Sequence, residues 1–215
     1  PEAVASYLRE ENDAALRVLS IHEAIPGHYL QLAASNRSGS LVRTVFPNGM
    51  FAEGWAVYVT LVMYDAGYAA EDPGFALQHW KMYLRATANA VLDVETHAGG
   101  MTEAQAMALM VYGSWQEQDV ARVKWMRARI ISKQLSTYFV GSLEMWDLEV
   151  EVRHRLAVAA GAGAEAVPEQ HIRGGVGDSP GFDRRTHLEQ VISYGTPPVK
   201  WCRELVLRDL EAGSA

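Results

Sequence analysis

Cysteine is nearly absent from this sequence, which has Cys202 as its single example among 215 residues. One cysteine excludes an intrachain disulfide and the cysteine clusters that build structural zinc sites. Long apolar runs are missing too, because no stretch reaches the roughly 18 residues that a membrane-spanning helix needs. The sequence therefore predicts a protein without a membrane span, whose fold does not depend on disulfides.

Basic residues are outnumbered: 19 Lys and Arg stand against 26 Asp and Glu, which gives a net charge of −7 and a pI near 5.5. No run of Lys or Arg provides the positive surface that nucleic acids or anionic membranes require, so we expect no nucleic-acid partner. The apolar share of 49% and the charged share of 21% are typical of a soluble globular protein. The length suits one domain with a substantial core, or a two-lobed helical unit.

An initiator methionine and a signal-peptide pattern are also lacking at the start, PEAVASYLREEN. This segment is typical of the middle of a helix-rich protein, so we expect the chain to be a fragment or a processed product. The start of the sequence does not indicate a cellular compartment. The protein is expected to be soluble, and either cytoplasmic or secreted with its signal removed.

Apolar residues recur at helical spacing in almost every segment, which predicts an all-α fold. Turn-forming residues mark 36–49 as a loop and 161–181 as a mobile surface loop. Thr102 and Ser114 each begin a capping-box pattern that predicts the start of a helix, and Asp183 is expected to cap another. The expected helices cover residues 2–21, 28–35, 50–67, 75–97, 102 onward, 114 onward, 135–160, 183–194 and a last one that ends at residue 210.

The segment IHEAIPGHYLQ differs from the HExxH signature of zinc peptidases, because its second histidine comes two residues late. On a regular helix, His22 and His28 would be separated by about 120° and about 9 Å, so their rings could not reach one zinc ion. Pro26 breaks the helix by clashing with the carbonyl four residues before it, and Gly27 tolerates unusual backbone angles. If the residues between the histidines bulge outward, both imidazoles can face one point.

A third ligand is needed, since catalytic zinc commonly has two histidines and one carboxylate and keeps a position for water. Glu53 is the preferred candidate, because it is a lone carboxylate in an otherwise apolar helix and needs a cation nearby. Gly54 beside it would permit close helix approach. Glu23 would lie near the bound water as the general base. The alternative interpretation, two partly exposed histidines and an unrelated glutamate, stays open on spacing alone.

HEAIPGHYLQ followed by EGWAVY resembles the bacterial domain-of-unknown-function family 885, whose local pattern is similar to that of the gluzincin zinc peptidases. LDVETH (92–97), QLSTYFVG (134–141) and FDRRTHLEQVISYGTPPVKWCRE (182–204) are similar to later segments of that family. The resemblance covers most of residues 15–205, which correspond to the carboxy-terminal part of a longer family protein. It implies that residues 1–215 form a single helical catalytic domain, a multi-helix core like that of zinc peptidases.

The resemblance implies that His22, His28 and Glu53 are the metal ligands and that Glu23 is the base. It also implies that further residues line the site: His97, Tyr138 and His187. A hydrogen bond from one of these side chains would steady the oxyanion that forms during hydrolysis.

Three positions depart from the family pattern: Asn89 stands in place of Arg, Glu95 in place of Gly and Thr186 in place of Phe. The missing arginine puts in doubt a salt bridge to a substrate carboxylate or to Asp93. Asp93 and His97 are four residues apart on one helix face, which suits either a surface pair or a carboxylate–histidine hydrogen bond that supports a metal site. Seven further titratable residues are expected to be solvated: Glu10, Glu11, His79, Glu149, Glu151, His154 and His171.

These patterns predict a zinc-dependent hydrolase, a peptidase or amidase, in which Glu23 takes a proton from a water activated by the metal. Two alternatives stay open: a catalytically inactive metal-binding helical module that acts through a partner, and a helical scaffold without metal. The same ligands would accept Mn²⁺, Co²⁺ or Fe²⁺ in place of Zn²⁺. The expected partners are a peptide or amide substrate and the missing amino-terminal region of the same protein.

Overall fold

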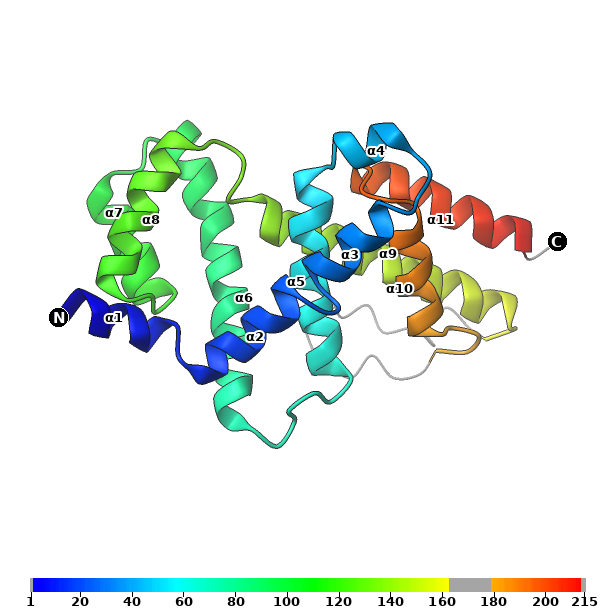
Figure 1. Cartoon of the computed structure of the whole chain (residues 1–215), viewed down its shortest axis with the longest axis horizontal. Coiled ribbons are helices and arrows are strands. Elements are labelled where there is room, and N and C mark those ends of the chain that lie inside the picture. The colour runs from blue at the N-terminus through cyan, green and yellow to red at the C-terminus, as the bar shows by residue number, and fades with distance from the viewer. Residues whose placement is uncertain (1, 163–178, 214–215) are drawn as a thin grey trace.

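The computed structural model describes residues 2–162 and 179–213, and every regular element within them is a helix (Figure 1). The all-α prediction is therefore confirmed for these residues. In chain order the α-helices are α1 (Glu2–Glu10), α2 (Asp13–Glu23), α3 (His28–Ser35), α4 (Leu41–Val45), α5 (Gly49–Asp65), α6 (Pro73–Val94), α7 (Glu103–Ala108), α8 (Gln118–Ile130), α9 (Thr137–Ala159), α10 (Arg184–Ser193) and α11 (Val199–Gly213). Two π-helical turns, η1 (Glu95–Gly99) and η2 (Leu109–Gly113), follow α6 and α7. Within the described ranges, no helix is both long enough and apolar enough to cross a membrane.

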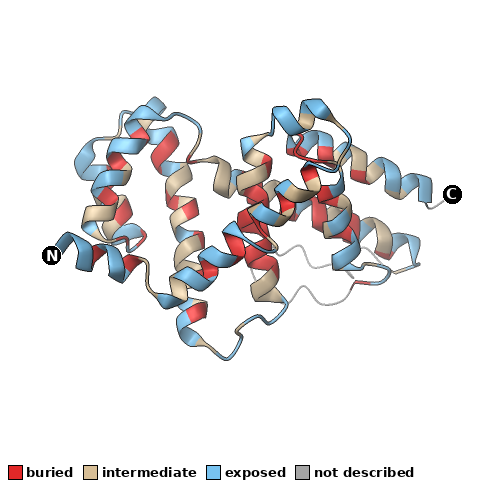
Figure 2. Cartoon of the chain, viewed as in Figure 1, coloured by how far each residue is buried: buried red, intermediate tan, exposed pale blue. Residues whose placement is uncertain are grey.

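Helix α5 forms the centre of the larger core and is buried over most of its length (Figure 2). It is apolar on all sides, as expected of a helix that other elements surround. Trp55 and Tyr58 of α5 pack with Trp146 of α9. Helices α10 and α11 close this core with Val191 and Cys202. The helix expected over residues 50–67 is thus confirmed, although it ends two residues earlier at Asp65, and Cys202 is buried.

Two glycines lie where α5 and α9 cross. A Cβ on Gly54 would come within 2.4 Å of the carbonyl carbon of Gly141, and a Cβ on Gly141 would come within 2.2 Å of the carbonyl oxygen of Met50. The two backbones can approach this closely only because neither residue has a side chain. The close approach predicted at Gly54 is thus confirmed, and it fixes α5, with Glu53, against the helix that carries Tyr138.

A second, smaller core joins α6 to α7, η2 and α8 at the other end of the molecule (Figure 1). Leu92 and Trp125 are buried in it. Helix α1 is fastened to this half through Glu10, whose buried carboxylate lies 3.0 Å from Lys81 Nζ and 2.9 Å from an Arg85 guanidinium nitrogen. Glu10 is 1% exposed, so its expected solvation is wrong.

The expected single helix over residues 2–21 is wrong, because the chain forms two helices with a break at Asn12. The Asn12 side chain accepts a hydrogen bond from the backbone N–H of Ala15 at 3.1 Å and thereby caps α2. Residues 36–49, expected to be a loop, contain the short helix α4, which Ser40 caps in the same way. In both places a capping side chain starts a helix that apolar spacing did not reveal.

Two of the three capping predictions are confirmed. Thr102 forms the capping box with Gln105, and Asp183 caps α10. The box predicted at Ser114 is wrong, because its hydroxyl donates back to a carbonyl of η2 and α8 begins only later. The mobile loop expected over residues 161–181 lies largely outside the described residues.

Candidate metal centre

The chain leaves α2 one residue after His22 and enters α3 at His28. The residues between the two helices are not helical, and the peptide bond between Ile25 and Pro26 is cis. The two imidazole rings meet edge to face, with their centroids 4.8 Å apart. The predicted break in the helix is present, and it brings the two rings together.

Gly27 permits this turn because its backbone lies against the end of α2. A Cβ at this position would fall 1.8 Å from the carbonyl oxygen of His22. Any other residue would push the start of α3 away, because real carbon and oxygen atoms do not approach so closely. The carbonyl oxygen of Pro26 accepts a hydrogen bond from the indole Nε1 of Trp55 at 2.9 Å. The turn is thereby tied to α5.

Glu53 lies two residues before Trp55 on α5 and faces both histidines. Its Oε2 atom is 3.3 Å from Nε2 of His28 and 3.7 Å from Nε2 of His22. Ligand atoms around a tetrahedral zinc ion, with bonds of about 2.0–2.1 Å, are separated by about 3.3–3.4 Å. The contact of Glu53 with His28 has that spacing, and the contact with His22 is slightly longer.

Glu23 follows His22 directly in the chain and is exposed to solvent. Its carboxylate and the ring nitrogens of His22 and His28 provide three potential ligand atoms that lie within 4.8 Å of one another. Glu23 therefore belongs to the same group of side chains as Glu53, which contacts both histidines. Its position allows proton transfer to a group held at the centre, without the cost of burying a second carboxylate.

Glu53 is charged despite its partial burial. Burial raises the pKa of its carboxyl group, but the neighbouring imidazoles of His22 and His28 outweigh this effect and hold the pKa at about 2. The contact with Glu53 in turn raises the pKa of His28. Two imidazoles thus face a permanent carboxylate, which attracts a proton or a metal cation to the space between them.

The donor set fits a divalent transition metal, because two imidazole nitrogens and one carboxylate oxygen are ligands typical of catalytic zinc. Nδ1 of His22 is buried and has no hydrogen-bond partner among the described residues. This ring therefore lacks the outer acceptor that usually orients a metal-binding histidine. Packing orients it instead, since the Tyr138 ring stacks on it with a centroid distance of 6.4 Å.

Tyr138, on α9, places its hydroxyl group near Glu53 and the two histidines. The side-chain amide of Gln134 donates a hydrogen bond to this hydroxyl at 2.9 Å. Burial, and then the negative charge of Glu53, raises the pKa of Tyr138. The hydroxyl is therefore protonated at neutral pH and can donate a hydrogen bond to a ligand.

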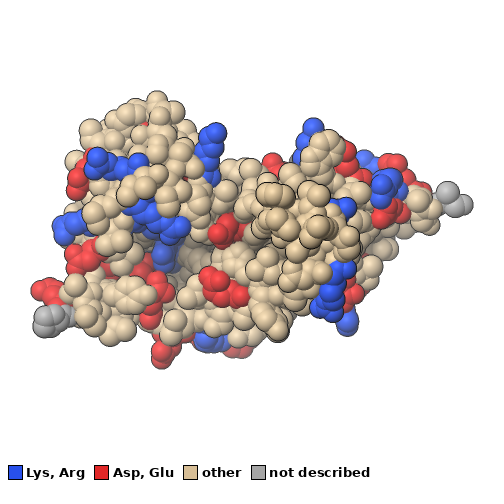
Figure 3. Space-filling model, turned by 45° about the horizontal axis from the view of Figure 1, so that its top comes forward, with Lys and Arg blue, Asp and Glu red and all other residues tan. Residues whose placement is uncertain are grey.

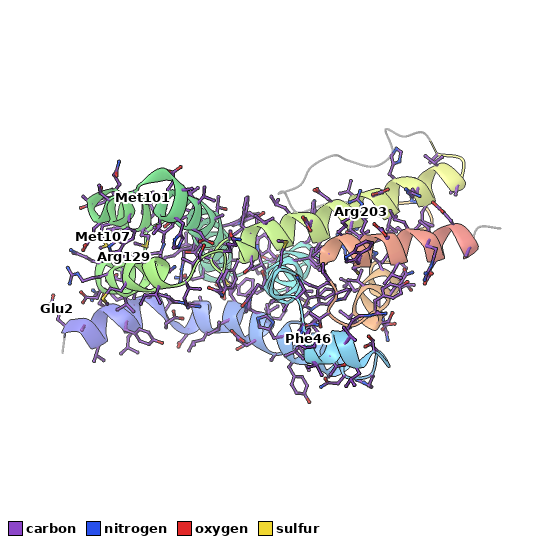
Figure 4. The ribbon with its side chains drawn as sticks, turned by 90° about the horizontal axis from the view of Figure 1, so that it is seen from above. Glu2, Phe46, Met101, Met107, Arg129 and Arg203 are labelled. Atoms are coloured by element: carbon purple, nitrogen blue, oxygen red, sulfur yellow. The ribbon has the colours of Figure 1, made fainter. Side chains whose placement is uncertain are left out.

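A cleft of about 620 Å³ opens beside the cluster and has His22 and Tyr138 among its lining residues. Its other walls come from α1, α6 and α8. Figure 3 shows the hollow in this face of the molecule, with Lys and Arg side chains along one wall. Seen from above, the helices between Glu2 and Phe46 follow one long side of the molecule, opposite α9 and α11 (Figure 4). A cleft of this volume can hold a peptide segment of a few residues.

His97 does not join the cluster. Its Nε2 atom lies 2.9 Å from the carbonyl oxygen of Ala128 and 3.9 Å from Oδ1 of Asp93, so the expected hydrogen bond with Asp93 is not formed. Asp93 is buried and accepts hydrogen bonds from the backbone N–H groups of Lys133 and Ser136. The interpretation of the two residues as a surface pair is also wrong, because Asp93 anchors the turn that precedes α9.

His187 lies in the larger core and does not line the cleft, so its expected position is corrected. It is 3% exposed, under the ring of Phe182, and next to the charges of Glu149 and Arg153. Burial lowers its pKa to about 4, so the ring is neutral at pH 7. His79 was expected at the surface and is also buried.

Three contributions to the site had no clear sequence pattern. Trp55 packs in the larger core and also donates the hydrogen bond that holds the turn between the histidines. Gln134 orients Tyr138 from the preceding turn. Lys124 and Arg127 line the cleft from a helix without a motif. Of these residues, only Trp55 could be singled out from the sequence, because it belongs to the EGW segment that begins with Glu53.

The sequence matches the family described as "Bacterial protein of unknown function (DUF885)" over residues 2–206. A solved structure of a "putative lipoprotein" of unknown function from Shewanella oneidensis has a TM-score of 0.81 and 39% identity, over 96% of this chain and 34% of that one. A "putative lipoprotein" from Colwellia psychrerythraea has a TM-score of 0.77 and 24% identity, over 93% of this chain and 31% of that one. No curated protein matches the chain.

The chain thus spans about a third of the length of both similar structures. The Colwellia structure supports the fold alone, whereas the Shewanella structure is similar enough in sequence to support common ancestry. Because the family match extends over nearly all of the sequence, this chain belongs to DUF885, a family of bacterial proteins of unknown function.

Proposed function

We propose that this chain is the catalytic part of a zinc-dependent hydrolase that cleaves a peptide or amide bond. The observation that carries the proposal is the convergence of Nε2 of His22 and Nε2 of His28 on Oε2 of Glu53, at 3.7 and 3.3 Å. A partly buried carboxylate and two imidazoles around one point are costly to desolvate, and a bound cation would compensate that cost. The cleft beside them gives a substrate access.

Each polar residue of the cluster has a role in this proposal. A bound zinc ion would supply a Lewis acid that polarises the scissile carbonyl and makes a water molecule more acidic. His22, His28 and Glu53 would hold the ion. Glu23 would accept the proton of the attacking water and deliver it to the leaving nitrogen. Tyr138 would donate a hydrogen bond to the developing oxyanion.

The test combines elemental analysis with one substitution. The purified chain, loaded with zinc and dialysed, is expected to retain one zinc ion per molecule and to cleave members of a peptide library. Glu23→Gln removes the base but no ligand, so it should lower kcat by about 10²–10⁴-fold and leave the zinc content unchanged. Glu71→Gln, at an exposed position outside the cleft, is the matched control and should keep full activity.

The outcomes separate the proposal from its alternatives. Cleavage that survives removal of the metal by a chelator would rule out the proposed chemistry. Stoichiometric zinc without any cleavage by the unchanged protein would favour a metal-binding module. A protein that retains no zinc would favour a metal-free scaffold.

A further inference from the structure

The wall of the cleft that faces the cluster is positively charged, although the whole chain carries a net charge of −7. Arg85 of α6 and Lys124 and Arg127 of α8 are among its lining residues. Asp119 is the one carboxylate among the described lining residues, and it lies 3.6 Å from Arg122, which is outside the cleft. A cleft with excess positive charge in an acidic protein attracts an anionic ligand.

Two of these cations have only neutral hydrogen-bond partners. Lys124 donates to the side-chain oxygens of Asn89 at 3.1 Å and Gln116 at 2.6 Å. Arg127 donates to the side-chain oxygen of Gln134 at 3.1 Å. Neither cation has a carboxylate within 4 Å in the part of the chain that the structure describes. Arg85 differs, because it forms an ion pair with the buried Glu10.

Lys124 is placed unfavourably for a charged group, because it is buried and the carboxylates that attract it, Glu10 and Glu11, form no ion pair with it. Burial, and then repulsion by Arg85, lowers its pKa to about 7. An anion beside it would restore the full charge of the ammonium group and would compensate the loss of water around it.

The cationic wall is connected to the candidate metal centre through two intervening side chains. Arg127 donates to Gln134, and Gln134 donates to the hydroxyl of Tyr138, which stacks on His22. Lys124 precedes Arg127 by three residues, so the two side chains project from the same face of α8. A substrate group bound by Lys124 and Arg127 would therefore lie in the same cleft as a peptide bond placed at His22.

We propose that Lys124 and Arg127 bind a carboxylate of the substrate, so that the enzyme acts on peptides with a negative charge close to the scissile bond. This inference rests on the proposed hydrolase function and names its substrate class. The carboxylate is either the carboxy-terminal group of a short peptide or the side chain of an acidic residue. Two cations from adjacent turns can bind both oxygens of one carboxylate, which an uncharged amide cannot match.

The experiment compares three probes of equal length: acetyl-Ala-Ala-Ala with a free carboxylate, the same peptide as its amide, and acetyl-Ala-Glu-Ala amide. Affinities are measured by titration calorimetry with the zinc-free chain, so that a carboxylate cannot bind to the metal. Cleavage rates are measured separately with the zinc-loaded chain. We expect a charged probe to bind at least ten-fold more tightly than the uncharged amide. The favoured charged probe identifies the source of the carboxylate.

Substitutions on α8 test the residues. Arg127→Gln and Lys124→Met should each reduce the preference for the charged probe to less than three-fold. Arg129→Gln is the matched control, since Arg129 lies two residues further on the opposite side of α8 and does not line the cleft. It should retain the preference. Because Arg127 is exposed, its substitution should leave the fold intact, and circular dichroism spectra check all three variants.

The result distinguishes this inference from the function on which it rests. Equal affinities for all three probes, or a preference that survives both substitutions, would overturn the carboxylate site even if zinc-dependent cleavage occurs. A preference that disappears in Arg127→Gln and Lys124→Met supports the site even if the chain cleaves nothing, and in that case the hydrolase proposal alone fails.

Discussion

At the scale of single residues, His79 stacks on Tyr64 with a centroid distance of 4.4 Å and is 1% exposed. Neither of its ring nitrogens has a hydrogen-bond partner among the described residues. Burial lowers its pKa to about 4, so the ring is neutral at pH 7. An unsatisfied buried polar group costs about 1–3 kcal/mol, so histidine is destabilising here relative to an apolar ring.

His79→Phe is expected to raise the free energy of unfolding by about 1 kcal/mol at pH 7, because it removes these unsatisfied nitrogens. The gain should grow in acid. The unfolded histidine takes up a proton near pH 6.5 and the folded one only near pH 4, so the unchanged protein loses up to about 3 kcal/mol as the pH falls through this window. The variant should lose less, although the buried His187, with a pKa of about 4, keeps part of the slope.

Urea unfolding at pH 7 and pH 5 measures both effects. His154→Phe is the control, because His154 is exposed and its replacement should leave the pH dependence unchanged. A His79→Phe variant that is less stable than the unchanged protein at both pH values would contradict the prediction.

Residues whose chemistry follows from local sequence could be identified in advance, and residues whose partners are distant could not. Glu53 stood out as a lone carboxylate in an apolar helix. Glu10 and Glu149 were expected to be solvated, but each is 1% exposed. Glu10 pairs with Lys81, 71 residues away along the chain, and Glu149 pairs with Arg184, 35 residues away. No local pattern shows these two distant pairs, because tertiary packing brings them together. Glu149 also pairs with Arg153 four residues on, but that spacing fits a solvated helix face equally well.

At the scale of helices, the crossing of α5 and α9 determines where Glu53 meets the two histidines. Gly54→Ala places a methyl group 2.4 Å from the backbone of Gly141, and neither helix backbone can yield without disturbing the core. Overpacking of this kind lowers the free energy of unfolding by roughly 1–3 kcal/mol. Because this contact is between two backbones, we expect a loss of about 3 kcal/mol. The displaced Glu53 should also weaken zinc binding.

Gly49→Ala on the same helix is the matched control, because a Cβ there meets nothing within 4 Å. It should leave stability unchanged or slightly higher, since alanine restricts the unfolded chain. Urea unfolding compares the two variants. Equal stability of Gly54→Ala and Gly49→Ala would show that the helices separate without cost.

Apolar periodicity predicts most of the helices, including the apolar helix α5, but it does not predict several helix boundaries. Thr102 and Asp183 were predicted correctly as caps because a helical pattern follows each of them directly. The cap at Asn12 has no clear signal, because apolar residues continue at helical spacing on both sides of the break. Ser114 resembles a cap in sequence, but its hydroxyl donates to the helical turn before it. The same side chain can close one helix or open the next, and sequence alone does not decide between them.

At the scale of the whole molecule, the candidate metal centre joins side chains from three different helices. His22 ends α2, His28 begins α3, and Glu53 belongs to the central α5. Helix α5 is the centre of the larger core, and α2 runs to it from the half of the molecule that holds the smaller core (Figure 1). A bound ion would connect all three helices in the folded state only, because the unfolded chain does not hold the ligands together.

Zinc should therefore stabilise the whole chain against unfolding. A ligand that binds only the folded state adds about 4 kcal/mol when its free concentration is 1,000 times Kd. For a chain of this size each kcal/mol raises Tm by about 2–4 °C, so we expect an increase of roughly 10 °C that a chelator reverses. Glu53→Gln should lose most of this increase because it removes the anionic ligand, whereas Glu23→Gln should keep it. Magnesium should have no effect, since it prefers six oxygen ligands over imidazole. A zinc-dependent shift of equal size in Glu53→Gln and in the unchanged protein would place the ion elsewhere, and the three helices would then be held together by packing alone.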